Sequence, residues 1–110
     1  MNSKAEKIAM LNDAFREKAG QGALVCLTPG IKSLSIADHY EVFSLIRTFN
    51  DFSEKNNPYG ERDFGAIDYK ENRIFWKIDY YDNDMECGSE DPSDPAKTTR
   101  VMTVMMAYEY

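Results

Sequence analysis

The chain has 110 residues, a mass of 12.6 kDa, 43% hydrophobic residues and 29% charged residues, which fits one globular domain and excludes disordered and fibrous proteins. Nineteen acidic against thirteen basic residues give a net charge of −6, which opposes direct binding to nucleic-acid phosphates. No apolar run approaches the roughly 20 residues of a membrane span, and no secretory leader heads the sequence, so we expect a cytoplasmic protein with a single domain over 1–110.

The first half of the sequence predicts two helices and one short strand. Ser3 to Ala19 has apolar residues three or four positions apart and begins with a Ser-x-x-Glu capping box, which predicts a helix. The apolar run Ala23 to Thr28 predicts a buried strand, and Pro29 favours a single helical turn after it. Ser35 to Asn50 is predicted as the second helix, opened by a second capping box with Asp38.

The second half predicts a loop, a β-hairpin and a last helix. Asp51 to Arg62 is loop by composition, and two alternating segments, Phe64 to Tyr69 and Arg73 to Tyr81, predict paired strands. After an acidic loop over 83–94, Asp94 as N-cap and Pro95 at the first helical position predict a helix. Four residues of the second strand share its expected core face: Ile74, Trp76, Ile78 and Tyr80.

These elements follow the order α-β-α-β-β-α, which predicts an α+β fold: a small antiparallel sheet of about three strands packed with three helices. The last segment carries Val101, Val104, Met105 and Tyr108 at helical spacing. Its Val, Thr and Tyr content also suits a strand. The proline cap and the length of the segment favour the helix.

The excess of negative charge is concentrated in one stretch of the chain. The interval between Lys77 and Lys97 contains seven acidic residues and no basic residue, whereas the rest of the chain carries twelve acids and thirteen bases. Such a block is a solvated loop, an attraction site for a basic partner or a cation site.

Three segments resemble a family of short bacterial proteins known only as a domain of unknown function. They are residues 60–65 (Gly-Glu-Arg-Asp-Phe-Gly), 75–82 (Phe-Trp-Lys-Ile-Asp-Tyr-Tyr-Asp) and 91–96 (Asp-Pro-Ser-Asp-Pro-Ala). The family is seen largely in alphaproteobacteria, often on plasmids and other mobile DNA. The resemblance implies no activity, and the mobile-element setting favours accessory roles such as counter-defence.

Few residues could carry catalysis or bind a metal. Two cysteines and one histidine are too few for a structural zinc site, and nothing in the local sequence supports a Cys26–His39 dyad. Cys26 lies in an apolar run and is expected in the core. Asp79 and Asp82 could join Glu61 or Asp63 around Mg²⁺ or Ca²⁺, so a carboxylate-based metal-binding protein or enzyme is an alternative.

We expect instead a small acidic, non-enzymatic protein-binding module with no cofactor. Its partner would be a basic protein surface, such as the groove of a nucleic-acid-binding complex, which it would inhibit by phosphate mimicry in the manner of an anti-CRISPR or anti-restriction protein. A homodimeric structural accessory subunit, joined through the apolar last segment, is a further alternative. The expected contact residues are Asp79, Tyr80, Tyr81, Asp82, Asp84, Met85, Glu86, Glu90 and Asp91.

Overall fold

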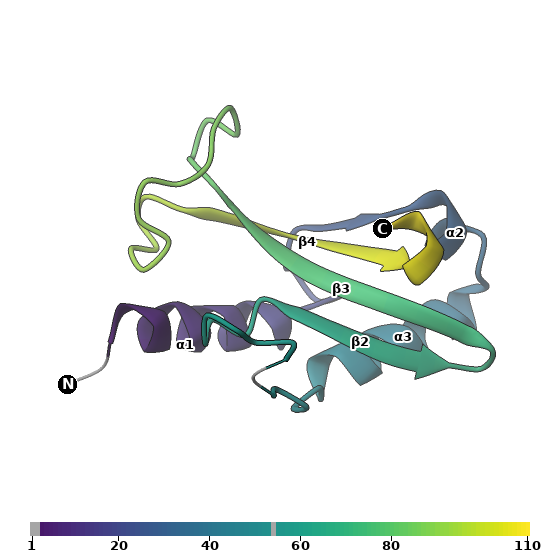
Figure 1. Ribbon diagram of the computed structural model, residues 1–110. Helices are drawn as coiled ribbons and strands as arrows, with labels where there is room; N and C mark the ends of the chain where they lie inside the picture. Colours follow the sequence, from purple (N-terminus) through teal and green to yellow (C-terminus); the bar gives the residue numbers. More distant parts are fainter. Residues whose placement is uncertain (1–2, 54) are drawn as a thin grey trace.

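The computed structural model describes residues 3–53 and 55–110, so Glu54 of the predicted 51–62 loop lies outside the described residues. In chain order the elements are α1 (Lys4–Arg16), β1 (Val25–Leu27), α2 (Pro29–Lys32), α3 (Ile36–Arg47), β2 (Phe64–Tyr69), β3 (Asn72–Tyr81), β4 (Thr99–Met106) and the 3-10 turn η1 (Ala107–Glu109). The strands form one sheet in the order β1-β4-β3-β2 (Figure 1). β1 runs parallel to β4, and the other neighbours are antiparallel.

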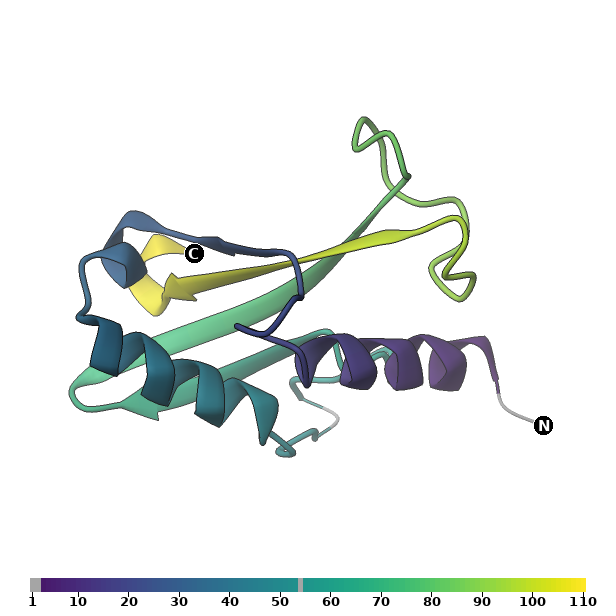
Figure 2. The same cartoon turned by 180° about the vertical axis from the view of Figure 1, so that it is seen from behind.

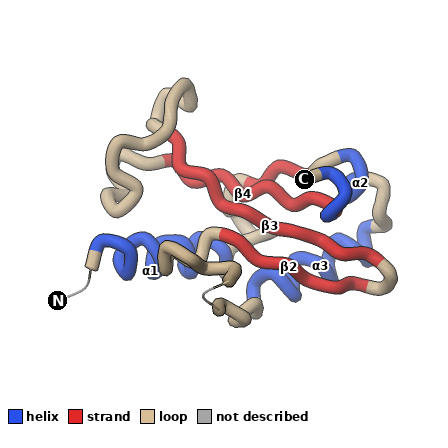
Figure 3. The backbone as a smooth tube through the Cα atoms, in the orientation of Figure 1, coloured by secondary structure: helices blue, strands red, loops and turns tan. Residues whose placement is uncertain are grey.

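Helices cover only one face of the sheet. Figure 2 shows α1 and α3 on the same side, in front of the strands when the molecule is seen from behind. α2 and η1 lie at one end of the sheet, beside β4 (Figure 3). Apart from η1 at that end, no helix of the described chain covers the opposite face, which is turned toward the viewer in Figure 1. The fold is therefore α+β with two layers.

Local sequence signals predicted the helix starts correctly. The Ser3 hydroxyl accepts a hydrogen bond from the backbone N–H of Glu6 at 3.1 Å, and the Ser35 hydroxyl accepts one from that of Asp38 at 3.0 Å. In both cases the acidic side chain bonds back to the backbone N–H of the serine, which completes a capping box. The helical turn predicted at Pro29 is also confirmed, because Pro29 is the first residue of α2.

The predicted last helix is wrong, because residues 99–106 form β4 in the middle of the sheet. Eight residue pairs join β4 to β3, and β1 pairs with its other edge. Asp94 accepts a hydrogen bond from the backbone N–H of Ala96 at 2.9 Å within a turn, so it caps no helix. The sheet accordingly has four strands, one of them in a parallel pair, where about three antiparallel strands were predicted.

The predicted strand after the first helix exists, but it lies at the edge of the sheet and is only partly buried. β1 is bonded on one side alone, and Val25 and Leu27 pack against the core while Cys26 between them is exposed. The expectation that Cys26 belongs to the core is therefore wrong. An edge strand with one covered face alternates between buried and exposed residues, and the short apolar run hid that alternation.

The core lies between the sheet and the two longer helices, on the face that the alternation of β3 predicted. Ile74, Trp76 and Ile78 are buried, and Tyr80 packs against the same cluster. The rings of Phe49 and Phe52 contact the Trp76 ring edge-on, at centroid distances of 5.4 and 6.2 Å. The alternate residues of β3 consequently point to the uncovered face of the sheet.

Candidate interaction surface

The segment between β3 and β4 forms a loop of two lobes, 82–88 and 89–98, that projects beyond the sheet (Figure 1). The first lobe is a short hairpin. The backbone N–H of Asp82 donates to the carbonyl of Cys87 at 2.8 Å, and that of Ser89 donates to the carbonyl of Tyr80 at 3.0 Å. Met85 at the turn has a φ of 60°, in the left-handed region. The hairpin carries acidic side chains away from the body of the protein.

Short polar contacts order the second lobe. The Asp91 carboxylate accepts hydrogen bonds from the backbone N–H of Ser93 at 3.1 Å and from its hydroxyl at 2.5 Å, and these bonds lower the pKa of Asp91. The Thr98 hydroxyl donates to the carbonyl of Asp91 at 2.9 Å and contacts the Ser89 hydroxyl at 2.7 Å. The lobe is thus closed on itself by its own side chains.

A buried polar node attaches this lobe to the body. Arg100 on β4 donates to the carbonyl of Pro92 at 2.6 Å and to the Asn12 side-chain oxygen at 2.7 Å. Asn12 on α1 is fully buried, and its amide donates to the carbonyl of Glu61 at 2.9 Å and to the Tyr80 hydroxyl at 2.8 Å. The node therefore joins α1, β3, β4 and the loop through satisfied hydrogen bonds.

The positive charge of Arg100 in the node is accommodated by hydrogen bonds and an aromatic ring rather than by a buried ion pair. Arg100 is 8% exposed, and its guanidinium lies over the Tyr80 ring at 5.1 Å from the centroid. Burial lowers the pKa of Arg100 and raises the pKa of Tyr80, whose hydroxyl donates to the Glu61 carboxylate at 2.8 Å. Within the described residues, no carboxylate lies within ion-pair distance of Arg100.

The structure separates the predicted contact residues into paired and unpaired acids. Asp79 pairs with Lys77 at 2.9 Å, Glu90 with Lys97 at 3.3 Å and Asp91 with Lys4 of α1 at 3.4 Å. These pairs lower the negative charge at the base of the loop and along β3.

The tip of the first lobe keeps its charge. The Asp82 carboxylate accepts a hydrogen bond from the backbone N–H of Glu86 at 3.0 Å, and neither Asp84 nor Glu86 has a side-chain partner in the part of the chain that the structure describes. Asp84, Met85 and Glu86 are exposed. Unpaired carboxylates are thus concentrated at the end of the projecting hairpin.

A polar hollow of about 400 Å³ lies between the two lobes. Three carboxylates line it, and Lys97, which is already paired with Glu90, is its one basic residue. The full lining is Asp82, Asn83, Asp84, Gly88, Glu90, Ala96 and Lys97. A concave site with converging carboxylates suits an entering lysine or arginine side chain, because a charged hydrogen bond to a carboxylate is stronger than a neutral one.

The two neighbouring tyrosines point in different directions. The Tyr80 hydroxyl belongs to the buried node, so this residue positions the loop more than it presents a contact surface. Tyr81 lies one position further along β3, on the face that no helix covers, and is half-buried. Of the predicted apolar contacts, Met85 is the one at the exposed tip.

The residues suggested for the metal and hydrolytic alternatives have other partners. Asp79 pairs with Lys77, and the Glu61 carboxylate accepts the Tyr80 hydroxyl. Burial raises the pKa of Asp63, and nearby Glu61 and Asp79 raise it further. Among residues 3–53 and 55–110, no three His, Cys, Asp or Glu side chains gather in a way that could hold a metal ion.

The suggested Cys26–His39 dyad gains no support from the geometry. The His39 Nε2 lies 2.6 Å from the carbonyl of Ile31, so this nitrogen donates and holds the ring against α2. Cys26 is on the exposed edge strand. The described residues show no hydrogen bond between the two side chains.

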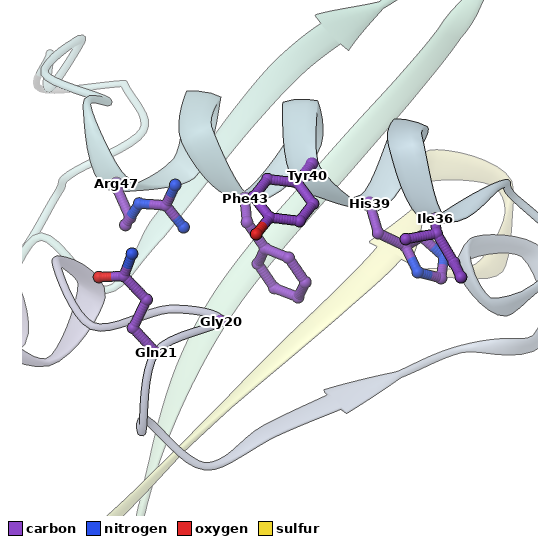
Figure 4. A pocket seen from close by; sticks show the side chains of 7 residues that line it. All are labelled: Gly20, Gln21, Ile36, His39, Tyr40, Phe43 and Arg47. Atoms are coloured by element: carbon purple, nitrogen blue, oxygen red, sulfur yellow. The ribbon is translucent and has the colours of Figure 1, made fainter.

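A second hollow, which the sequence did not reveal, lies between α3 and the turn before β1 (Figure 4). Its volume is about 270 Å³, and Tyr40 and Ile36 beside it are 75% and 80% exposed. Exposed apolar residues four positions apart on a helix were the one sequence signal that could have indicated this hollow. Its remaining lining residues are Gly20, Gln21, His39, Phe43 and Arg47.

Comparison with known proteins identifies the family. The chain belongs to the family described as "Protein of unknown function (DUF3768)", which matches residues 27–109 and so includes the whole loop between β3 and β4. Comparison with curated proteins and with solved structures finds no match. In the described part of the chain, none of the helices has the length and apolar character required to cross a membrane.

Proposed function

Since family membership leaves the activity open, we propose from the geometry that this protein is a small acidic, non-enzymatic binding module. Its contact surface is the loop 82–98, and its partner is a basic protein surface. One observation carries the proposal: three carboxylates surround a hollow at the end of a loop that the Arg100 node holds in place. Binding groups held by a rigid support lose less conformational entropy on association.

The hollow gives the attraction a specific form. A lysine or arginine side chain of the partner would enter between the two lobes and donate hydrogen bonds to Asp82, Asp84 and Glu90. The exposed tip at Glu86 would add long-range attraction that accelerates encounter. Asp91 and Tyr80, in contrast, would act by holding the loop in its shape.

The finer version of the proposal names the partner as a nucleic-acid-binding complex. Grooves that hold phosphates are basic, and clustered carboxylates can occupy such a groove in place of phosphates. The resemblance to proteins encoded on mobile DNA favours a role in counter-defence, of the anti-CRISPR or anti-restriction type. In this version, added nucleic acid displaces the protein from a complex recovered from the native host, and failure of that competition contradicts phosphate mimicry.

The experiment that tests the broader proposal uses hexa-arginine as a basic probe in isothermal titration at low salt. The triple variant Asp82→Asn, Asp84→Asn, Glu86→Gln should lose about tenfold in affinity, because three exposed ion pairs contribute about 1.5 kcal/mol together. Raising the salt concentration should weaken the wild-type interaction steeply.

A matched control separates the loop from the net charge of the chain. Glu17, Glu41 and Glu71 are exposed acids at the C-cap of α1, on α3 and in the hairpin turn. Changing these three to glutamine removes the same amount of charge and should leave the affinity nearly unchanged. An equal loss in both triple variants would mean that the probe responds to total charge, and the proposed surface would be rejected.

A further inference from the structure

The uncovered face of the sheet is a second surface, independent of the acidic loop. The register places Phe75 opposite Met105, and Lys77 opposite Thr103, on this face. Phe64 on β2 lies opposite Lys77. Outside the end occupied by η1, the described chain provides no element that packs over these side chains (Figures 1 and 2). Phe64 and Phe75 are half-buried on this face, whereas Val101 and Met105 of β4 are already buried among their neighbours, at 7% and 4% exposure.

Three aromatic rings give this face a raised apolar cluster. The Phe64 and Phe75 rings are 5.1 Å apart, and Tyr110 packs edge-on against both at 6.3 and 5.7 Å. The Tyr110 side chain remains 78% exposed. Beside the cluster lies a hollow of about 390 Å³, bordered by Phe64, Tyr110 and the 81%-exposed Tyr59. The face thus offers the exposed Tyr110 ring and a recess next to it.

The charges of this face cancel locally. Lys77 pairs with Asp79 at 2.9 Å, which raises the pKa of Lys77, and Arg73 pairs with Asp68 at 3.0 Å across the hairpin. All four residues lie on the uncovered face, so the charges that the strands carry on this face cancel on a chain that carries −6. A strongly charged partner would find no unpaired opposite charge on these strands. A second copy of the chain, which brings the same balanced pairs, fits this face better.

We propose that two copies of this protein pack uncovered face against uncovered face about a two-fold axis, forming a four-layer dimer with α1 and α3 outermost. Such an interface is self-complementary, because each copy contributes the same rings and the same recess. The acidic loops project beyond the sheet and stay available to other partners.

The area of the face sets the strength of the dimer. Strands lie about 4.8 Å apart and rise about 3.3 Å per residue, so eight residues each of β3 and β4 and six of β2 present about 350 Å² per copy. With the rim formed by η1 and the 55–60 loop, two copies bury about 1,000 Å², the lower end for specific interfaces. The dimer is therefore a weak one that forms at high protein concentration.

Sedimentation equilibrium over a range from low micromolar to near-millimolar concentration tests the proposal. The wild-type mass should rise from 12.6 kDa toward twice that value. Phe75→Glu places like charges opposite each other at the centre of the interface and should keep the protein monomeric throughout. Tyr110→Glu, at a more exposed position, is a second variant in case the first disturbs folding, which circular dichroism reports.

Tyr40→Glu on α3 is the matched control, because it adds the same charge at an exposed aromatic residue on the helical side. It should dimerise as the wild type does. A wild-type protein that stays at 12.6 kDa at every concentration overturns the proposal. So does a dimer that survives both Phe75→Glu and Tyr110→Glu, and so does a dimer that Tyr40→Glu alone dissociates, since it would then use the α3 hollow.

Discussion

Replacing Asn12 by leucine should destabilise the protein more than its position on a surface helix suggests. Asn12 is fully buried and makes three hydrogen bonds, to the Glu61 carbonyl, the Tyr80 hydroxyl and the Arg100 guanidinium. Leucine has a similar volume, so no large cavity forms. The variant therefore isolates the loss of polar contacts from the loss of packing.

The magnitude follows from the partners that the substitution leaves behind. The bond to Arg100 involves a charged donor and contributes about 1.5–3 kcal/mol, and the two neutral bonds contribute about 0.5–1.5 kcal/mol each. Arg100 is 8% exposed, so water cannot fully replace the lost acceptor. We expect a decrease of about 4 kcal/mol in the free energy of unfolding, out of the roughly 5–15 kcal/mol typical of a domain.

Urea unfolding followed by fluorescence measures this decrease. Trp76 is the single tryptophan and is fully buried, so its emission reports loss of the core. The control is Asn83→Ala, which also removes an asparagine that bonds within the loop region, but at an exposed position. It should cost less than about 1 kcal/mol. An Asn12→Leu protein within 1 kcal/mol of wild type would refute the account of the buried node.

Two further variants test the packing and the electrostatics of the body. Gly65→Ala should cost about 3 kcal/mol in urea unfolding, because its new methyl group would lie 2.4 Å from the indole nitrogen of buried Trp76. Gly88→Ala, whose methyl group meets only ordinary contact distances, should be nearly neutral, and equal losses would contradict the packing argument. The hydrogen bond from Lys70 is the main reason why the pKa of Asp38 is lowered. The contribution of the Asp38 carboxylate to stability is therefore complete above about pH 4, and it is lost as the pH falls further. The stability difference between wild type and Asp38→Asn should shrink from pH 5 to pH 2, and a constant difference would exclude this role.

The parts of the fold that sequence predicted are those determined by neighbours along the chain. Ser3 and Ser35 cap helices through residues three positions away, and the core face of β3 follows from strict alternation. The prediction for the segment that forms β4 failed for the opposite reason. Val101, Val104 and Met105 fit a helical spacing, and a central strand buried on both faces shows no alternation that would exclude it. Only the distant partners β1 and β3 decide between the two.

In the candidate site, too, sequence predicted the features set by local residues and missed those set by long-range contacts. The sequence located the block of acidic residues, because the positions of charged residues can be read from it directly. It could not show that Lys4, on the first helix, would pair with Asp91, or that Asn12 would meet Arg100 across 88 positions. Such long-range pairs leave no local pattern. For this reason Tyr80, grouped with the contact residues by sequence, proves to be part of the support beneath the loop.

The two proposed surfaces differ in the sign of their response to salt, which makes them separable in one protein. Docking of the acidic loop depends on attraction between opposite charges, so added salt weakens it. The dimer face is locally neutral, but it brings together two chains that each carry −6. Screening of that repulsion should strengthen the dimer as salt rises. Because the loop and the bare sheet face share no charged pair, a change at one surface should leave the salt response of the other unaltered.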